Sequence, residues 1–181
     1  MGGKRQLAII GFKGCGKSTV GHMLAEKTGR PFQDTDQILE SLYLKKNGEK
    51  LGFREIYIRH GRGYFEDLET EAVGEAMNGE AKVISFGGGS LMTMDARGLS
   101  TGDAILIYLT AEPGVLFDRI VAQGIPAFFT TADPRQSFEQ LLEKRRPIYE
   151  KYADITVDNS YSSPEQTVEE VMEALKEKSL I

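Results

Sequence analysis

A glycine-rich segment directly after a short apolar run sets the strongest constraint on the fold. Leu7–Ile10 is wholly apolar, and residues 11–19 read Gly-Phe-Lys-Gly-Cys-Gly-Lys-Ser-Thr, which matches the phosphate-binding P-loop pattern at every required position. In such a loop the glycines let backbone N–H groups point at phosphate oxygens, and a helix that starts at Lys17 adds the positive end of its dipole. The sequence thus predicts a strand, an anion-binding loop and a helix in succession.

This loop predicts that the chain binds a nucleoside triphosphate together with magnesium. The Lys17 ammonium would reach the terminal phosphates, and the Ser18 hydroxyl is the expected inner ligand of the metal ion. The residues of the loop that we expect to bind ATP are Gly14, Cys15, Gly16, Lys17, Ser18 and Thr19.

Length and charge limit the number of domains and the class of partner. The 181 residues fit one domain over 1–181, and the formal net charge of −5 argues against nucleic acid or an anionic membrane surface as the partner. No apolar run approaches the ~20 residues that span a bilayer, and the N-terminus lacks the apolar stretch of a signal peptide. We therefore expect a cytoplasmic monomer that acts on a small molecule.

Short apolar runs alternate with segments of helical spacing along the chain. Further strands are predicted at 31–34, 82–86, 104–109 and 154–157. Helices are predicted from 17 to about 28, from 113 to about 123, from 134 to about 152 and from 164 onward. This alternation predicts an α/β fold with a central parallel sheet of about five strands and helices on both faces. Residues 37–78 are almost wholly helical, with breaks at 47–48 and 61–63, and we expect an inserted helical layer there.

Two carboxylates and a glycine run follow neighbouring predicted strands. Asp34 and Asp36 lie two residues apart at the end of the second strand, and Gly87, Gly88 and Gly89 follow the third. One carboxylate could hold magnesium and the other a substrate hydroxyl, since ligands of open α/β folds bind at the carboxyl edge of the sheet. The alternative is that one of the two acids only caps the next helix. The glycines would let a ligand approach the backbone closely.

These motifs, taken together, resemble those of the shikimate kinase family, from about Leu7 to about Glu177. The resemblance also rests on Phe65, Glu69, the segment Glu-Lys-Arg-Arg-Pro-Ile-Tyr at 143–149 and the last strand at 153–158. It implies a P-loop kinase three-layer sandwich, with a helical substrate-binding region at about 37–78 and a lid at about 122–133. It also implies ATP-dependent phosphorylation of shikimate to shikimate 3-phosphate, in the pathway of aromatic amino acid biosynthesis.

The resemblance implies roles for individual residues. Ser18 and Asp34 would serve the magnesium ion, directly or through water. Lys17 and Asp36 would be the catalytic residues, and Asp36 would contact the substrate hydroxyls, with its role as the base left open. The adenine would lie between Arg119 and Pro164. The residues expected at the acceptor are Asp36, Arg62, Glu66, Gly87, Gly88, Gly89 and Arg145.

The sequence departs from the family at two of the three arginines that hold the substrate carboxylate. Arg145 matches one of them, but Glu66 and Ile125 stand at the other two positions. Glutamate beside a carboxylate would be repulsive, by about 1 kcal/mol at ~4 Å in water and more at lower dielectric. Arg62 precedes Glu66 by one helical turn, so the pair could be an exchange of charges in which Arg62 or Arg59 reaches the acceptor. The alternative is a surface ion pair of at most ~1 kcal/mol.

The expected lid raises the same question, because residues 122–132 contain no lysine or arginine. Three functions therefore stay open. The first is phosphorylation of shikimate. The second is phosphorylation of a less anionic hydroxylated acceptor by a kinase of the same fold, and the third is nucleotide-dependent regulation with little or no turnover.

Overall fold

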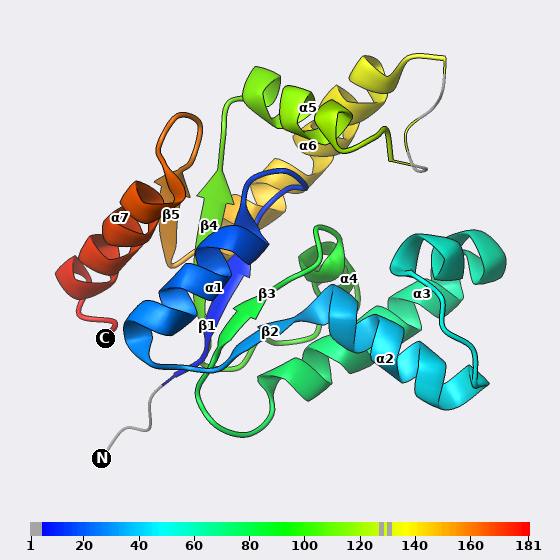
Figure 1. Cartoon of the computed structure of the whole chain (residues 1–181), viewed down its shortest axis with the longest axis horizontal. Helices are drawn as coiled ribbons and strands as arrows, with labels where there is room; N and C mark the ends of the chain where they lie inside the picture. Colours follow the sequence, from blue (N-terminus) through cyan, green and yellow to red (C-terminus); the bar gives the residue numbers. More distant parts are fainter. Residues whose placement is uncertain (1–4, 127–128, 130–131) are drawn as a thin grey trace.

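Five strands form one sheet in the order β2-β3-β1-β4-β5, and all neighbouring pairs are parallel (Figure 1). This computed structural model describes residues 5–126, 129 and 132–181. The strands are β1 (Leu7–Ile10), β2 (Phe32–Asp34), β3 (Val83–Ser85), β4 (Ile105–Thr110) and β5 (Ile155–Asp158). The helices are α1 (Lys17–Thr28), α2 (Thr35–Asn47), α3 (Phe53–Met77), α4 (Ser90–Ala96), α5 (Pro113–Ala122), α6 (Pro134–Tyr152) and α7 (Pro164–Glu177).

The parallel sheet confirms the predicted α/β fold, and each predicted strand lies within one residue of the observed one. Strands that are buried on both faces give continuous apolar runs, which is why β1 and most of β4 are easily found in the sequence. The short helix α4 was not predicted. It follows three glycines and has only seven residues, too few for a clear helical period.

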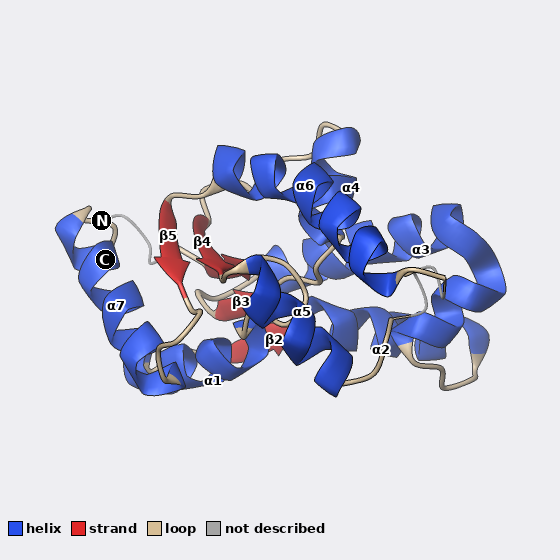
Figure 2. Cartoon of the chain, turned by 90° about the horizontal axis from the view of Figure 1, so that it is seen from above, coloured by secondary structure: helices blue, strands red, loops and turns tan. Residues whose placement is uncertain are grey.

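Helices cover both faces of the sheet. In the view from above, α1 and α7 lie on one side of the strands, and α4 and α6 lie on the other (Figure 2). The main core joins buried side chains of the central strands with those of these helices, among them Leu24, Phe138, Tyr149 and Val171. Within the described residues, no helix combines the length and the apolar character needed to cross a membrane.

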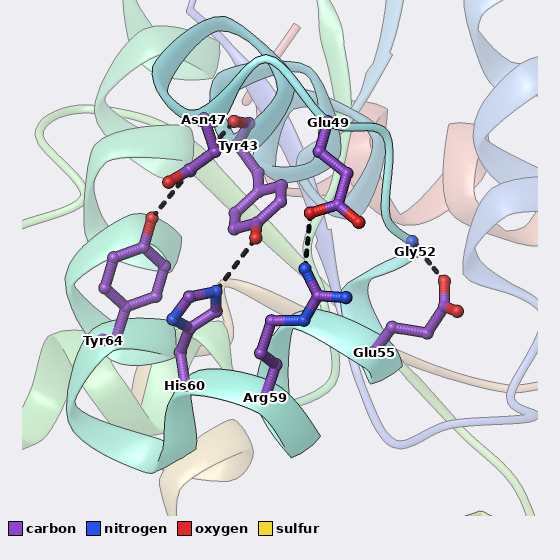
Figure 3. A network of polar contacts seen from close by, with 8 residues as sticks. All are labelled: Tyr43, Asn47, Glu49, Gly52, Glu55, Arg59, His60 and Tyr64. Atoms are coloured by element: carbon purple, nitrogen blue, oxygen red, sulfur yellow. Dashed lines mark hydrogen bonds and ion pairs between the residues drawn. The ribbon is translucent and has the colours of Figure 1, made fainter.

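The helices α2 and α3 pack against each other beside the sheet and have a hydrophobic core of their own (Figure 1). We refer to them as the α2–α3 pair. Their core consists of Leu39, Leu42, Tyr43, Leu51, Ile56, Leu68 and Ala72. Polar contacts close the outer end of the pair, including a 2.9 Å hydrogen bond between Tyr43 Oη and His60 Nε2 (Figure 3). The break predicted near 61–63 is a kink inside α3, where Gly61 has φ 76° and ψ −179°.

The order of the strands places the glycine-rich loop at the switch point of the sheet. The chain leaves β1 toward β2 and β3 on one side and later adds β4 and β5 on the other, so the loop after β1 sits where the two directions diverge. Open α/β folds bind ligands at this point. The loop also packs tightly, since a Cβ on Gly11 (φ 146°) would lie 2.3 Å from the carbonyl oxygen of Leu109.

Candidate active site

The glycine-rich loop holds Lys17 close to its own backbone. Lys17 Nζ donates hydrogen bonds to the carbonyl oxygens of Gly11 and Phe12, each 3.0 Å long. The helix α1 starts at Lys17 with Gly16 in the left-handed conformation (φ 97°), so the N-terminal amides of α1 face the end of the loop. A phosphate bound there would meet backbone N–H groups, the helix dipole and a lysine that can turn toward it.

Asn159, which the sequence did not point to, fixes the outer side of this loop. Its Nδ2 donates to the carbonyl of Cys15 at 2.8 Å, and its Oδ1 accepts from the hydroxyl of Thr167 at 2.7 Å. The contact is close, because a Cβ on Gly16 would lie 2.6 Å from Asn159 Nδ2. The Cys15 side chain is buried. The Cys15 backbone N–H donates to the carbonyl of Phe12, and the residue does not line the cavity described below.

Asp34 caps α2, as one interpretation predicted, and it also contacts Ser18; its role toward magnesium stays a prediction. Its Oδ1 accepts a 2.9 Å hydrogen bond from the backbone N–H of Asp36 and so caps α2. Its Oδ2 accepts from the Ser18 hydroxyl at 2.9 Å. A hydroxyl and a carboxylate oxygen are hard ligands that suit magnesium, which usually takes one or two carboxylates and keeps water and phosphate in its other positions. The described residues include no cluster of three or more acidic, His or Cys side chains that would bind a metal unaided.

Asp36 lies against the glycine run after β3. A Cβ on Gly87 would lie 2.4 Å from Asp36 Oδ1, and the Gly87 amide donates to the Thr35 hydroxyl at 2.8 Å. Burial raises the pKa of the Asp36 carboxyl to about 7; the charge of Asp34 adds to this effect and that of Lys17 opposes it. The carboxyl can thus carry or release a proton near neutral pH.

We expect Asp36→Asn to raise the free energy of unfolding in metal-free buffer, by about 2–4 kcal/mol at pH 8.5. The raised pKa means that the folded state binds this proton more tightly than the unfolded state, whose pKa is near 3.8. The Asp36 carboxyl therefore costs the wild type no free energy of unfolding below pH ~4, where it is protonated in both states. As the pH rises to about 7, the free energy of unfolding of the wild type falls. The gain at pH 5.5 should be roughly half of that at pH 8.5.

Urea unfolding of both proteins at the two pH values measures this gain. Asp103→Asn, at an exposed site, is the matched control and should give no comparable pH-dependent gain. A gain for Asp36→Asn that is equal at both pH values would contradict the assignment of the raised pKa to Asp36.

Arg145 and Tyr149 of α6 hold the middle glycine of the run. Arg145 Nη1 donates to the carbonyl oxygen of Gly88 at 3.0 Å, and Tyr149 Oη donates to the same oxygen at 2.6 Å. On the neighbouring side, the buried Glu69 accepts hydrogen bonds from the hydroxyls of Ser90 and Thr93. The glycine run is therefore fixed from α3, α4 and α6 while its own backbone stays accessible.

Glu66 pairs with Arg62 and lies at the limit of an ion pair with Arg97, which binds Asp67 at 2.7 Å. Arg62 Nε lies 2.6 Å from Glu66 Oε1, and Arg97 Nη2 lies 4.0 Å from Glu66 Oε2. The Arg62 side chain is 77% exposed. Arg59 pairs with Glu49 at the outer end of the α2–α3 pair (Figure 3) and does not line the cavity described below. The geometry thus pairs Arg62 with Glu66 and leaves Arg59 away from the acceptor.

Arg119 and Pro164 lie near the outer edge of the site. Arg119 Nη2 donates to the carbonyl oxygen of Ser160 at 3.0 Å, which ties α5 to the loop before α7. Pro164 is the first residue of α7. Of the expected lid, residues 127, 128, 130 and 131 lie outside the described residues, and Phe129 is buried against Phe138.

One cavity of about 910 Å³ brings most of the expected residues together. Cys15, Gly87 and Pro164 are the expected site residues that do not line it; Gly87 lies behind Asp36 instead. Among described residues, the basic ones that line it are Lys13, Lys17, Arg54, Arg62, Arg119, Lys144 and Arg145, and the acidic ones are Asp34, Asp36, Glu66 and Glu69. Seven cations against four acids make the cavity a positive region in a chain of net charge −5.

Lys13 and Arg54 were not predicted as site residues. Lys13 stands at a variable position of the loop motif, and Arg54 is the second residue of α3, where no motif marks it. The lone signal for Lys13 was its place inside the phosphate loop. Arg54 could not have been found without the packing of α3 beside the sheet.

Comparison with known proteins gives one consistent result. The family model for shikimate kinase matches residues 13–176. Shikimate kinase of Symbiobacterium thermophilum is 33% identical, over 95% of this chain and 97% of the relative. That of Rhodopseudomonas palustris is 34% identical, over 96% of this chain and 82% of the relative. The structure of shikimate kinase from Acinetobacter baumannii in complex with shikimate has the same fold, with a TM-score of 0.84 at 24% identity and 98% and 96% coverage.

Proposed function

This chain belongs to the shikimate kinase family, and on that premise we propose that it phosphorylates one hydroxyl of shikimate with ATP. It is an ATP-dependent phosphotransferase that acts on a hydroxyl group. The observation that carries the choice of acceptor is the single positive cavity, which joins the phosphate loop, Asp36 and Arg145. Shikimate is a hydroxylated ring with a carboxylate, and it needs both a hydroxyl partner and a cation.

On the nucleotide side, the proposal assigns the phosphates to the loop and to Lys17. Lys17 would exchange its two carbonyl partners for the terminal phosphates, at little cost, since its present hydrogen bonds are to its own loop. Ser18 and Asp34 would hold magnesium, which would offset the negative charge that develops on the phosphates during transfer. Arg119 and Pro164 would lie on the two sides of the adenine.

On the acceptor side, Asp36 would position the reacting hydroxyl and accept its proton. The carboxyl group is held in place by the backbone of Gly87 and is near the charge of Lys17, so it lies between the glycine run and the phosphate loop. Gly88 and Gly89 would let the ring approach the backbone. Arg145, which already borders Gly88, would pair with the carboxylate.

The positive charge of the cavity does not favour the alternative of a less anionic acceptor, and the paired state of Glu66 removes the main argument for it. The lack of lysine and arginine in residues 122–132 would favour a regulator without turnover, but the retained Lys17, Asp34 and Asp36 argue against it. We also propose that the enzyme is a cytoplasmic monomer, because the phosphate loop, Asp36 and Arg145 meet in a cavity within one chain.

Release of ADP from magnesium-ATP, with and without millimolar shikimate, tests the function. We expect shikimate-dependent turnover by the wild type and a loss in kcat/KM for shikimate of about 10- to 100-fold in Arg145→Ala, because a charge-assisted contact to the carboxylate is removed. Arg146→Ala is the matched control, since Arg146 is the next residue and does not line the cavity. Wild-type protein that binds ATP but gives no shikimate-dependent ADP would refute the proposed acceptor.

A further inference from the structure

Two cations of the cavity have no polar partner among the described residues, although Arg54 lies over the ring of the neighbouring Phe53, 6.0 Å from its centroid. Lys13, in the phosphate loop, and Arg54, at the start of α3, make neither a hydrogen bond nor an ion pair with any residue that the structure describes, although both line the cavity. Each is half-buried. Half-buried charges that face a cavity without a direct ion pair are the arrangement expected where an anion binds.

The two charges act on each other. Burial lowers the pKa of Lys13, the charge of Arg54 lowers it further, and Asp36 opposes both effects. Lys13 and Arg54 are far apart in the sequence, but they line the same cavity as the proposed catalytic carboxylate and are close enough to influence each other's charge. A bound anion would relieve the repulsion between them, so the protein without ligand is prepared for a negative group at this place.

Of the acidic residues in the cavity, Asp36 is the one that acts on Lys13, and two others are engaged elsewhere. Glu66 is held by Arg62 and Arg97, and Glu69 accepts from two hydroxyls. Arg145, by contrast, borders the same space as Lys13. A Cβ on Gly88 would lie 3.5 Å from both Arg145 Nη1 and the backbone nitrogen of Lys13.

The position of Arg54 indicates the acceptor rather than the nucleotide. The phosphates of the nucleotide already have Lys17, the loop amides and the N-terminus of α1. Arg54 comes from α3, the helix that also gives the cavity the rings of Tyr57 and Phe65, whose centroids lie 5.5 Å apart. Such rings suit the apolar faces of a cyclic acceptor.

We infer that Lys13 and Arg54, together with Arg145, bind the carboxylate of the acceptor and so determine its specificity. Lys13, from the phosphate loop, and Arg54, from the start of α3, would replace the positive charge that the family motif has at positions 66 and 125. An Arg fork can pair with a carboxylate through two hydrogen bonds, and the lysine adds a point charge. This inference rests on the proposed function, because it concerns the carboxylate of that acceptor.

Steady-state kinetics of Arg54→Ala and Lys13→Ala with shikimate and with its uncharged methyl ester test the inference. Each variant should raise KM for shikimate about 10- to 100-fold, while kcat and KM for ATP change less than about threefold. The wild-type preference for shikimate over the ester should fall by a similar factor. Arg54→Lys keeps the charge without the fork, so it should lose less than Arg54→Ala.

Arg59→Ala is the matched control, because Arg59 lies on the same helix, pairs with Glu49 and does not line the cavity. It should leave KM for shikimate unchanged. Thermal melts identify any variant that fails to fold, in which case Arg54→Lys alone decides. A fall in kcat at constant KM for shikimate would overturn the inference, since it would assign the two cations to the transferred phosphoryl group. Equal losses for shikimate and its ester would also overturn it.

The inference and the proposed function can fail separately. Wild-type turnover of shikimate with unaltered kinetics in both alanine variants overturns the inference alone. If the wild type gives no turnover, calorimetry with shikimate decides. Binding that is lost in Arg54→Ala supports the inference while the proposed function fails, and no binding by the wild type overturns both.

Discussion

Asp36→Asn is expected to lower kcat for shikimate phosphorylation by about 10²- to 10⁴-fold, the range for loss of a general base. Asparagine has nearly the same shape, so it fits against Gly87, but it cannot take the proton of the attacking hydroxyl. The carboxyl group is close to Lys17 and lies against the backbone of Gly87, so on the proposed function it would meet the attacking hydroxyl beside the terminal phosphate. The loss should therefore appear in kcat, with KM for ATP little changed.

A coupled assay for ADP, run over ranges of ATP and shikimate, separates these constants. Asp67→Asn is the matched control, because Asp67 is 74% exposed and pairs with Arg97 outside the cavity. The stability measurement on Asp36→Asn makes the test sharper, since a variant that is more stable at pH 8.5 yet slow cannot owe its loss to unfolding. Retention of more than about a tenth of wild-type kcat would exclude Asp36 as the base.

Lys17→Met is expected to lower kcat/KM for ATP by about 10²- to 10³-fold, the usual effect of removing one preorganised donor to the developing charge. Methionine fills a similar volume but provides neither charge nor donor. The carbonyl oxygens of Gly11 and Phe12 lose their hydrogen bonds to Lys17 in the variant, but Lys17 itself lines the open cavity, so water can enter the space that its ammonium leaves. We therefore expect a folded protein that binds ATP weakly and transfers its phosphoryl group slowly.

Lys27→Met serves as the control for Lys17→Met, because it makes the same change on the same helix α1. Lys27 is at the far end of α1, where it pairs with Glu169 on the surface. Binding of an ATP analogue by calorimetry and kcat with saturating shikimate should both stay near wild type in this control. Near-normal kcat/KM for ATP in Lys17→Met would show that the phosphates are held by the backbone alone.

The sheet and the nucleotide side could be predicted from the sequence because their signals are local. The phosphate loop is one continuous motif, and β1 and β4 are apolar along nearly their whole length, since helices cover both faces of the sheet. The acidic pair could be placed for the same reason, as Asp34 and Asp36 follow directly on β2.

The acceptor side could not be predicted equally well, because its charges come from separate elements. Reading the family motif position by position indicated a deficit of cations at 66 and 125. In the folded protein, Lys13 and Arg54 add positive charge to the same cavity, and Glu66 pairs with Arg62 and lies near Arg97. The role of Asn159 could not be predicted for the same reason, since Asn159 reaches the phosphate loop only because β5 packs beside β4.

The separate core of the α2–α3 pair divides the molecule into parts that can diverge at different rates. Its apolar residues pack mostly on one another, whereas the phosphate loop is anchored in the main core and by Asn159. A change of charge at position 66 or at position 54 would therefore leave the packing of the nucleotide side intact. A family built in this way can redistribute the charges around its acceptor over evolutionary time and keep the same phosphate donor.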